Sequence, residues 1–199
     1  NIYDDKKRHI SIDIKREDQI HTLVSGNKYR KLKYNIKQAL SENHHTVLTY
    51  GGAFSNHIAA TATASRICGL KSIGVIRGEE LKQRLEENPE FNPTLSYAKQ
   101  QGMQLHFINR KDYKIKDNPE AIKKLQQRFG SFYRIPEGGT NALAVRGCEE
   151  ILSDADKKYD IIACCVGTGG TLAGIINSSS KHQNVYGFSA LKKHHHEDI

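Results

Sequence analysis

Short apolar runs alternate along the chain with segments in which apolar residues recur at helical spacing. The runs predict strands at residues 9–15, 46–50, 72–77, 105–109, 132–135, 160–166 and 185–188. The helical spacing predicts helices at residues 28–41, 55–68, 93–102, 119–129, 142–152 and 171–178. The charged segment 78–91 fits either a short helix or a surface loop. Repeated strand–helix alternation predicts an α/β protein with parallel sheet.

The strand at 160–166 is almost continuously apolar, which is typical of a parallel strand buried on both faces. It contains Cys164 and Cys165, and the chain has two further cysteines, Cys68 and Cys148. No pair has the C-x-x-C spacing, so we interpret the neighbouring thiols as buried strand residues. Unpaired thiols suit a reducing compartment, and we expect a cytoplasmic protein.

Composition and charge narrow the class of protein further. The 199 residues are 37% hydrophobic, and no apolar run approaches the roughly 20 residues that span a bilayer, so no membrane is expected. The net charge of +8 raises the question of nucleic acid, but basic and acidic residues are mixed and aromatic residues are not interleaved with them. No nucleic-acid partner is expected.

A metal site is also not expected. Three consecutive histidines, 194–196, precede Glu197 near the end of the sequence. Consecutive side chains point in different directions on any regular element, so this run makes a poor ligand set.

A glycine-rich turn lies between the strand at 160–166 and the helix that follows it. Its sequence is Gly167, Thr168, Gly169, Gly170 and Thr171. Backbone N–H groups without a shielding Cβ, at the start of a helix, can bind an anion such as phosphate. The turn has neither the P-loop lysine nor the G-x-G-x-x-G spacing of dinucleotide sites, so a nucleotide-binding module fits poorly. A tight turn without a ligand is the alternative.

Lys28 follows Gly26 and Asn27 at the predicted start of a helix. The helix N-terminus and the nearby charges of Arg30 and Lys31 disfavour an additional cation, which favours the neutral, nucleophilic amine. A lysine that forms a Schiff base needs this form. Taken alone, a lysine in a lysine-rich helix is more commonly a solvated surface residue.

Ser55, Asn56 and His57 follow a strand and a Gly-Gly turn. They fit a helix cap, in which Ser55 or Asn56 accepts free N–H groups. They also fit a site in which Ser55 is a nucleophile or proton shuttle, Asn56 binds a ligand, and His57 is a neighbouring acid or base. The residues alone leave both interpretations open.

Five motifs in this order resemble the 1-aminocyclopropane-1-carboxylate deaminase and D-cysteine desulfhydrase family of pyridoxal-phosphate enzymes. They are KRED (15–18), SGNKYRKL (25–32), GGAFSNH (51–57), PEGGTN (136–141) and GTGGT (167–171). The resemblance extends over nearly the whole chain. It implies two open parallel-sheet α/β domains with a cofactor cleft between them. It implies a smaller domain at 34–136, and a larger one formed from 1–33 and 137–199.

The resemblance also implies roles for residues. Lys28 would bind pyridoxal 5'-phosphate as a Schiff base, Asn56 would hydrogen-bond the cofactor's ring hydroxyl, and residues 167–171 would hold its phosphate. Ser55 would act on the substrate, with Asn56 and His57 beside it. The implied partner is a small amino acid, and the implied assembly is a homodimer.

Two departures from the family pattern affect the expected reaction. The deaminases usually carry Gln at the position of His57, whereas the desulfhydrases carry His, as this chain does. This difference weakens the case for a cyclopropane substrate. Family chains also begin earlier and continue further, so we expect this chain to be incomplete at both ends.

We expect a deaminase or desulfhydrase that releases ammonia and a 2-oxo acid. The alternatives are a β-replacement enzyme, a racemase, or a non-catalytic cofactor-binding relative.

Overall fold

The computed structural model describes residues 1–24 and 26–190. The strands are β1 (Tyr3–Asp5), β2 (Ile10–Ile12), β3 (Thr46–Gly51), β4 (Lys71–Arg77), β5 (Met103–Ile108), β6 (Tyr133–Arg134), β7 (Ile161–Val166) and β8 (Asn184–Ser189). The α-helices are α1 (Asn27–Ser41), α2 (Asn56–Ile67), α3 (Leu81–Glu87), α4 (Pro93–Gln100), α5 (Arg110–Lys114), α6 (Pro119–Phe129), α7 (Ala142–Cys148) and α8 (Gly170–Ser178). The short 3-10 turns are η1 (Glu17–Gln19), η2 (Pro89–Phe91), η3 (Glu137–Gly139) and η4 (Asp154–Lys158).

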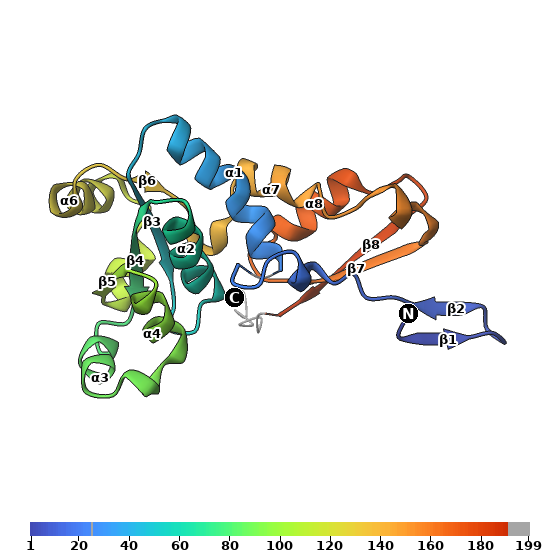
Figure 1. Ribbon diagram of the computed structural model, residues 1–199, viewed down its shortest axis with the longest axis horizontal. Helices are drawn as coiled ribbons and strands as arrows, with labels where there is room; N and C mark the ends of the chain where they lie inside the picture. The colour runs from blue at the N-terminus through green and yellow to red at the C-terminus, as the bar shows by residue number, and fades with distance from the viewer. Residues whose placement is uncertain (25, 191–199) are drawn as a thin grey trace, which may run out of the picture.

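Two parallel sheets organise these elements (Figure 1). A four-stranded sheet has the order β5-β4-β3-β6, and β7 pairs with β8 in a two-stranded sheet. The predicted α/β class with parallel sheet is therefore confirmed. The predicted first strand is corrected: only Ile10–Ile12 is extended, and it pairs antiparallel with β1 in a separate hairpin.

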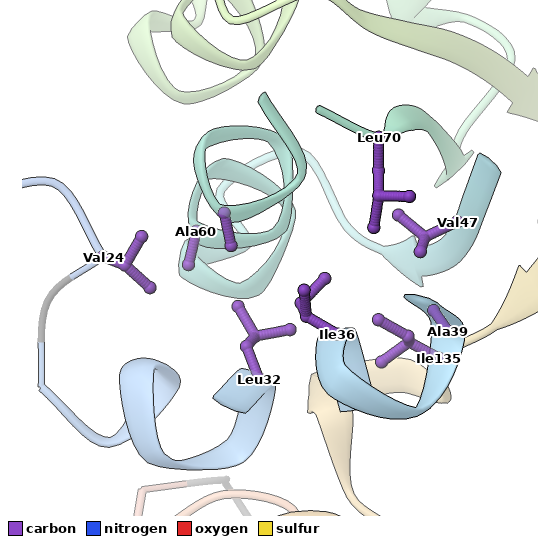
Figure 2. Close-up of a cluster of buried hydrophobic side chains, with 9 residues drawn as sticks. Val24, Leu32, Ile36, Ala39, Val47, Ala60, Leu70 and Ile135 are labelled. Atoms are coloured by element: carbon purple, nitrogen blue, oxygen red, sulfur yellow. The ribbon is translucent and has the colours of Figure 1, made fainter. Parts of the chain in front are cut away.

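The α1 helix is anchored against the four-stranded sheet by an apolar cluster (Figure 2). Leu32, Ile36 and Ala39 of α1 pack with Val47 of β3 and Ala60 of α2, and all five are almost inaccessible to solvent. The spacing of Leu32, Ile36 and Ala39 places these three side chains on one face of α1. This packing fixes α1, and with it the position of the residues at its N-terminus.

The same helix contacts α7 at very short range on another side. A Cβ added at Gly147 would lie 2.0 Å from the carbonyl oxygen of Arg30, and one added at Gly174 of α8 would lie 2.4 Å from Cβ of Cys148. Glycine at these two positions lets the α1, α7 and α8 backbones approach closely. The α1 helix therefore connects the two sheets.

The two-stranded sheet corrects one prediction. Its strand β7 is not buried on both faces: Ile161 of β7 and Phe188 of β8 are exposed, as is Cys165, while Cys164 is half-buried. The α7 and α8 helices cover one face with an apolar cluster, whereas the alternate residues of β7, Ile161, Ala163 and Cys165, are exposed. Of the four thiols, only Cys148 is buried.

Two further helix predictions are refined by the structure. The helix expected at 142–152 ends at Cys148, and the ambiguous segment 78–91 contains α3. The predicted helix starts at 93 and 142 agree with the structure, where Asn side chains cap both helices: Asn92 accepts from the Leu95 N–H and Asn141 from the Ala144 N–H.

The predicted domain division at residues 34 and 136 remains a prediction. The four-stranded sheet lies within 34–136 and the two-stranded sheet within 137–199. However, α1 runs across the first boundary and packs on both α2 and α7.

Within the described part of the chain, no helix combines the length and apolar character needed to cross a membrane. The same part contains no group of three or more His, Cys, Asp or Glu side chains arranged to hold a metal ion. The histidine run at 194–196 and Glu197 lie outside the described residues.

Gly147→Ala tests the close approach of α1 and α7. The added methyl group would meet the Arg30 carbonyl, so we expect the free energy of unfolding to fall by about 1–3 kcal/mol. Gly52→Ala is the matched control, because its Cβ would make only an ordinary 3.5 Å contact with Arg77. Equal stabilities of the two variants in urea denaturation would contradict the proposed tight contact.

Candidate functional site

A cavity of about 150 Å³ lies where the first turn of α1 meets the loop before α8. It is lined by Asn27, Lys28 and Lys31 of α1 and by residues 165–169, 171 and 172. The Asn27 amide donates to the Thr171 hydroxyl over 2.8 Å, which ties the two helix starts together. The structure therefore brings together Lys28 and the predicted anion-binding loop, residues 167–171, called the anion loop below. More than one hundred positions separate them in the sequence.

The glycine loop presents an accessible backbone. A Cβ added at Gly167 or Gly169 would meet no atom within 4 Å, and Gly169 has a φ of +82°, which favours glycine. The α8 helix starts at Gly170. Open N–H groups at the start of a helix, facing a cavity, can hold an anion.

Lys28 is largely buried at the edge of this cavity. Its amine donates to the Gly138 carbonyl over 3.2 Å. Burial, and next the charge of Lys31, lower the pKa of Lys28 from 10.5 to about 8. The sequence prediction of a lowered pKa agrees in direction, but the main cause is burial. Arg30, expected to contribute, pairs instead with Glu17 at 2.9 Å.

Lys31 is a site residue that sequence reasoning did not assign. It is only 2% exposed, and its amine donates to Gly138, Thr140 and Thr168. Among the described residues no carboxylate lies within 4.0 Å of it. Burial lowers its pKa as well. Its position three residues after Lys28, on the same face of one helix, is the signal that could have identified it.

Ser55 and Asn56 stand at the start of α2. Ser55 is the N-cap residue, and its hydroxyl accepts from the Ile58 N–H at 3.4 Å, as the capping interpretation expects. Asn56 is exposed, and its side chain forms no hydrogen bond to any described residue. Neither residue lines the 150 Å³ cavity. Their predicted roles toward cofactor and substrate remain proposals.

His57 is buried, with 1% of its surface exposed. Its Nε2 lies 2.8 Å from the Thr49 hydroxyl, whereas its Nδ1 has no partner in the described structure. Burial, followed by the charges of Lys28 and Lys31, holds the pKa of His57 well below its ordinary range. Both causes favour the neutral imidazole. The expected contact with substrate remains a proposal, and the cavity lining does not include this residue.

The η3 turn lies between Thr168 of the glycine loop and His57 of α2. A Cβ at Gly138 would meet Thr168 at 2.8 Å, and one at Gly139 would meet His57 at 2.9 Å. Both glycines have positive φ, +67° and +72°, so the turn requires glycine for its conformation and for its fit. The PEGGTN motif was noted in the sequence, but this function of its paired glycines was not anticipated.

The residues fit a cofactor that carries both an aldehyde and a phosphate. The Lys28 amine, with its lowered pKa, can be nucleophilic near neutral pH. The buried cation Lys31, which has no carboxylate partner among the described residues, lines the same cavity as the loop at the N-terminus of α8. The fold and this donor set fit an α/β protein that binds a cofactor through a lysine amine and a phosphate.

Comparison with known proteins agrees with this class. The model of the family described as pyridoxal-phosphate dependent enzyme matches residues 4–189. The chain belongs to this family, and its cofactor is pyridoxal phosphate.

Similar proteins narrow the family further. The bifunctional D-cysteine desulfhydrase/1-aminocyclopropane-1-carboxylate deaminase of Arabidopsis thaliana is 37% identical over 175 residues, 81% of this chain and 43% of that protein. A Thermotoga maritima protein, provisionally named a 1-aminocyclopropane-1-carboxylate deaminase, is 34% identical over 94% of this chain and 61% of its own length. The crystal structure of an ACC deaminase homologue matches with a TM-score of 0.68 and 29% identity, over 87% of this chain and 54% of that one. The chain thus spans about half the length of its relatives.

The pH dependence of acylation tests the environment of Lys28. We expect its reaction with acetic anhydride, measured by peptide mass spectrometry, to reach half its maximal rate near pH 8, because burial disfavours the charged amine. Lys71 is an exposed lysine that serves as an internal comparison. A half-maximal rate for Lys28 near the ordinary value of 10.5 would contradict the burial described above.

Proposed function

We propose that this chain carries the cofactor-binding part of a pyridoxal-phosphate-dependent deaminase or lyase that acts on a small amino acid. The expected products are ammonia and a 2-oxo acid, with sulfide also released if the substrate is D-cysteine. The single observation that carries the proposal is the common cavity of Lys28 and the 167–171 loop. The names of the relatives, deaminase and desulfhydrase, support the same reaction class.

In this proposal Lys28 holds the cofactor's aldehyde carbon, and the N–H groups of residues 167–171 hold its phosphate. The buried charge of Lys31 offsets the phosphate charge. Asn56 binds the ring hydroxyl of the cofactor. When bound, the cofactor supplies an electron sink that stabilises negative charge at the α-carbon of the amino acid.

The chain's own residues then orient the reactants and transfer protons. With a pKa of about 8, the Lys28 amine can accept and return a proton near neutral pH. The Gly138 carbonyl, 3.2 Å away, orients that amine. Ser55 assists at the substrate, with Asn56 and His57 beside it.

A β-replacement enzyme, a racemase and a non-catalytic relative remain the alternatives. Assays of the full-length protein with D-cysteine, 1-aminocyclopropane-1-carboxylate, L-serine and D-serine, with identification of products, separate them. Ammonia with a 2-oxo acid supports the proposal, whereas inverted substrate or a new β-substituent supports the alternatives.

The proposal also includes a homodimer and a cytoplasmic location, the latter because the four thiols are unpaired.

Reduction with borohydride after incubation with pyridoxal phosphate tests the assignment of Lys28. We expect a reduced pyridoxyl adduct on the peptide containing Lys28, because this amine lines the same cavity as the anion loop. Lys28→Ala should abolish the adduct and turnover. Lys37→Ala, at an exposed position of the same helix, should leave both unchanged. Turnover by the Lys28→Ala protein would overturn the assignment.

Lys31→Met tests the proposed contact with the phosphate. Hydrogen bonds to charged groups contribute about 1.5–3 kcal/mol, so we expect the affinity for pyridoxal phosphate to fall about 10-fold or more. The variant should be no less stable than the wild-type protein, because an unpaired buried cation is removed. Fluorescence titration measures the affinity, and an unchanged value would place the phosphate elsewhere.

A further inference from the structure

Thr49 connects His57 to the backbone that leads into η3. Its hydroxyl lies 2.8 Å from Nε2 of His57 and 2.9 Å from the carbonyl oxygen of Ile135, with the Pro136 carbonyl further away at 3.4 Å. Thr49 and His57 are both buried, so water does not compete for these bonds. The two residues come from β3 and from the first turn of α2.

The number of hydrogen atoms determines the tautomer of the ring. The Thr49 hydroxyl has one hydrogen, and the Ile135 carbonyl can only accept, so the hydroxyl donates to Ile135. Toward His57 it must then accept, and the hydrogen of the neutral ring lies on Nε2. Thr61, at 3.5 Å, is a second, longer contact of that nitrogen. The Nδ1 atom carries a free lone pair with no partner in the described structure.

The imidazole also packs directly on η3. The Cβ position of Gly139 would lie 2.9 Å from Cε1 and 3.2 Å from Nδ1 of His57, so only glycine allows the ring to lie there. On the other side, Thr168 occupies the corresponding space at Gly138. The turn is therefore held between α2 and the anion loop.

The orientation of this turn affects both lysines. The Gly138 carbonyl lies 3.2 Å from the amine of Lys28 and 3.2 Å from that of Lys31. These two lysines are the charged groups that act most strongly on His57, and both would oppose its protonation. Burial and the charges of these two lysines thus favour the neutral ring over the protonated one.

We propose that His57 and Thr49 are positioning residues: the neutral Nε2–H imidazole and the Thr49 hydroxyl hold the η3 turn so that the Gly138 carbonyl faces the Lys28 amine. The pair acts through the turn and needs no contact with cofactor or substrate. Its importance for catalysis rests on the proposed function of Lys28, but the arrangement itself is a property of the protein without cofactor.

Nitrogen-15 NMR of the histidines in the full-length protein tests the tautomer directly. We expect His57 to show a protonated Nε2 and an unprotonated Nδ1, and to remain neutral from about pH 5.5 to 8.5, where an ordinary histidine titrates. A hydrogen on Nδ1, or titration within this range, would overturn the proposal. This measurement requires no variant and is therefore independent of any effect on folding.

Thr49→Val tests the link to Lys28. The variant keeps the side-chain shape but loses the hydroxyl, so the turn loosens, water reaches the amine, and the pKa of Lys28 rises. We expect acylation of Lys28 at pH 7.5 to slow about threefold, which corresponds to about half a pKa unit. Thr49→Ser keeps the hydroxyl and should react as the wild-type protein does.

Thr63→Val is the matched control. Thr63 is also a buried threonine, but it belongs to α2, and its hydroxyl bonds to the Ala59 carbonyl and to Tyr97, not to the turn. We expect no change in Lys28 acylation. The proposal is overturned if folded Thr49→Val matches wild type, or if Thr49→Ser or Thr63→Val slows the reaction equally. All of these measurements use full-length protein from which the cofactor has been removed, so failure of the trapping experiment leaves them unaffected, and the reverse holds.

Discussion

Lys31, which is buried, and Lys28, which is half-buried, lie on one face of α1, share the Gly138 carbonyl and have no carboxylate partner among the described residues. Burying charge without an opposite charge is costly, so this arrangement needs support from elsewhere in the fold. The apolar face of α1 supplies that support by packing on α2 and β3, and Gly147 allows α7 to pack against the other side. An anion in the adjacent cavity would compensate the two amines.

The turn at η3 connects this charge arrangement to the rest of the fold. It contacts α1 through Gly138, α2 through Gly139 and the anion loop through Thr168. Each of these segments comes from a different part of the sequence. The proposed positioning of the Lys28 amine therefore depends on buried neutral groups as well as on the charged ones.

Local signals in the sequence predicted much of the fold. Helical spacing of apolar residues and compact apolar runs located most helices and strands, since these signals depend only on neighbouring residues. The strand β7 was misjudged, because its apolar sequence does not indicate which faces other elements cover, and Ile161 is exposed. Likewise, the strand predicted at 9–15 is shorter, Ile10–Ile12, and its antiparallel partner β1 was not predicted, because pairing partners are set by tertiary contacts.

The site was predictable only in part, for a similar reason. Lys28 and the 167–171 loop were identified by motif, and the structure places them on one cavity. Lys31 was overlooked because its position three residues after Lys28 was not used, and a lysine in a lysine-rich helix is more commonly solvated. The roles of Thr49 and Gly139 depend on contacts across 8 and 82 positions with His57, which no local pattern encodes.

The central claim is that the two lysines and the glycine loop form one cofactor site. A crystal structure of the full-length protein grown with pyridoxal phosphate tests it most directly. The account predicts continuous density from Nζ of Lys28 into the cofactor, with the phosphate against residues 167–171 and the Lys31 amine. Density for the cofactor on a different lysine, or a phosphate bound away from this loop, would contradict it.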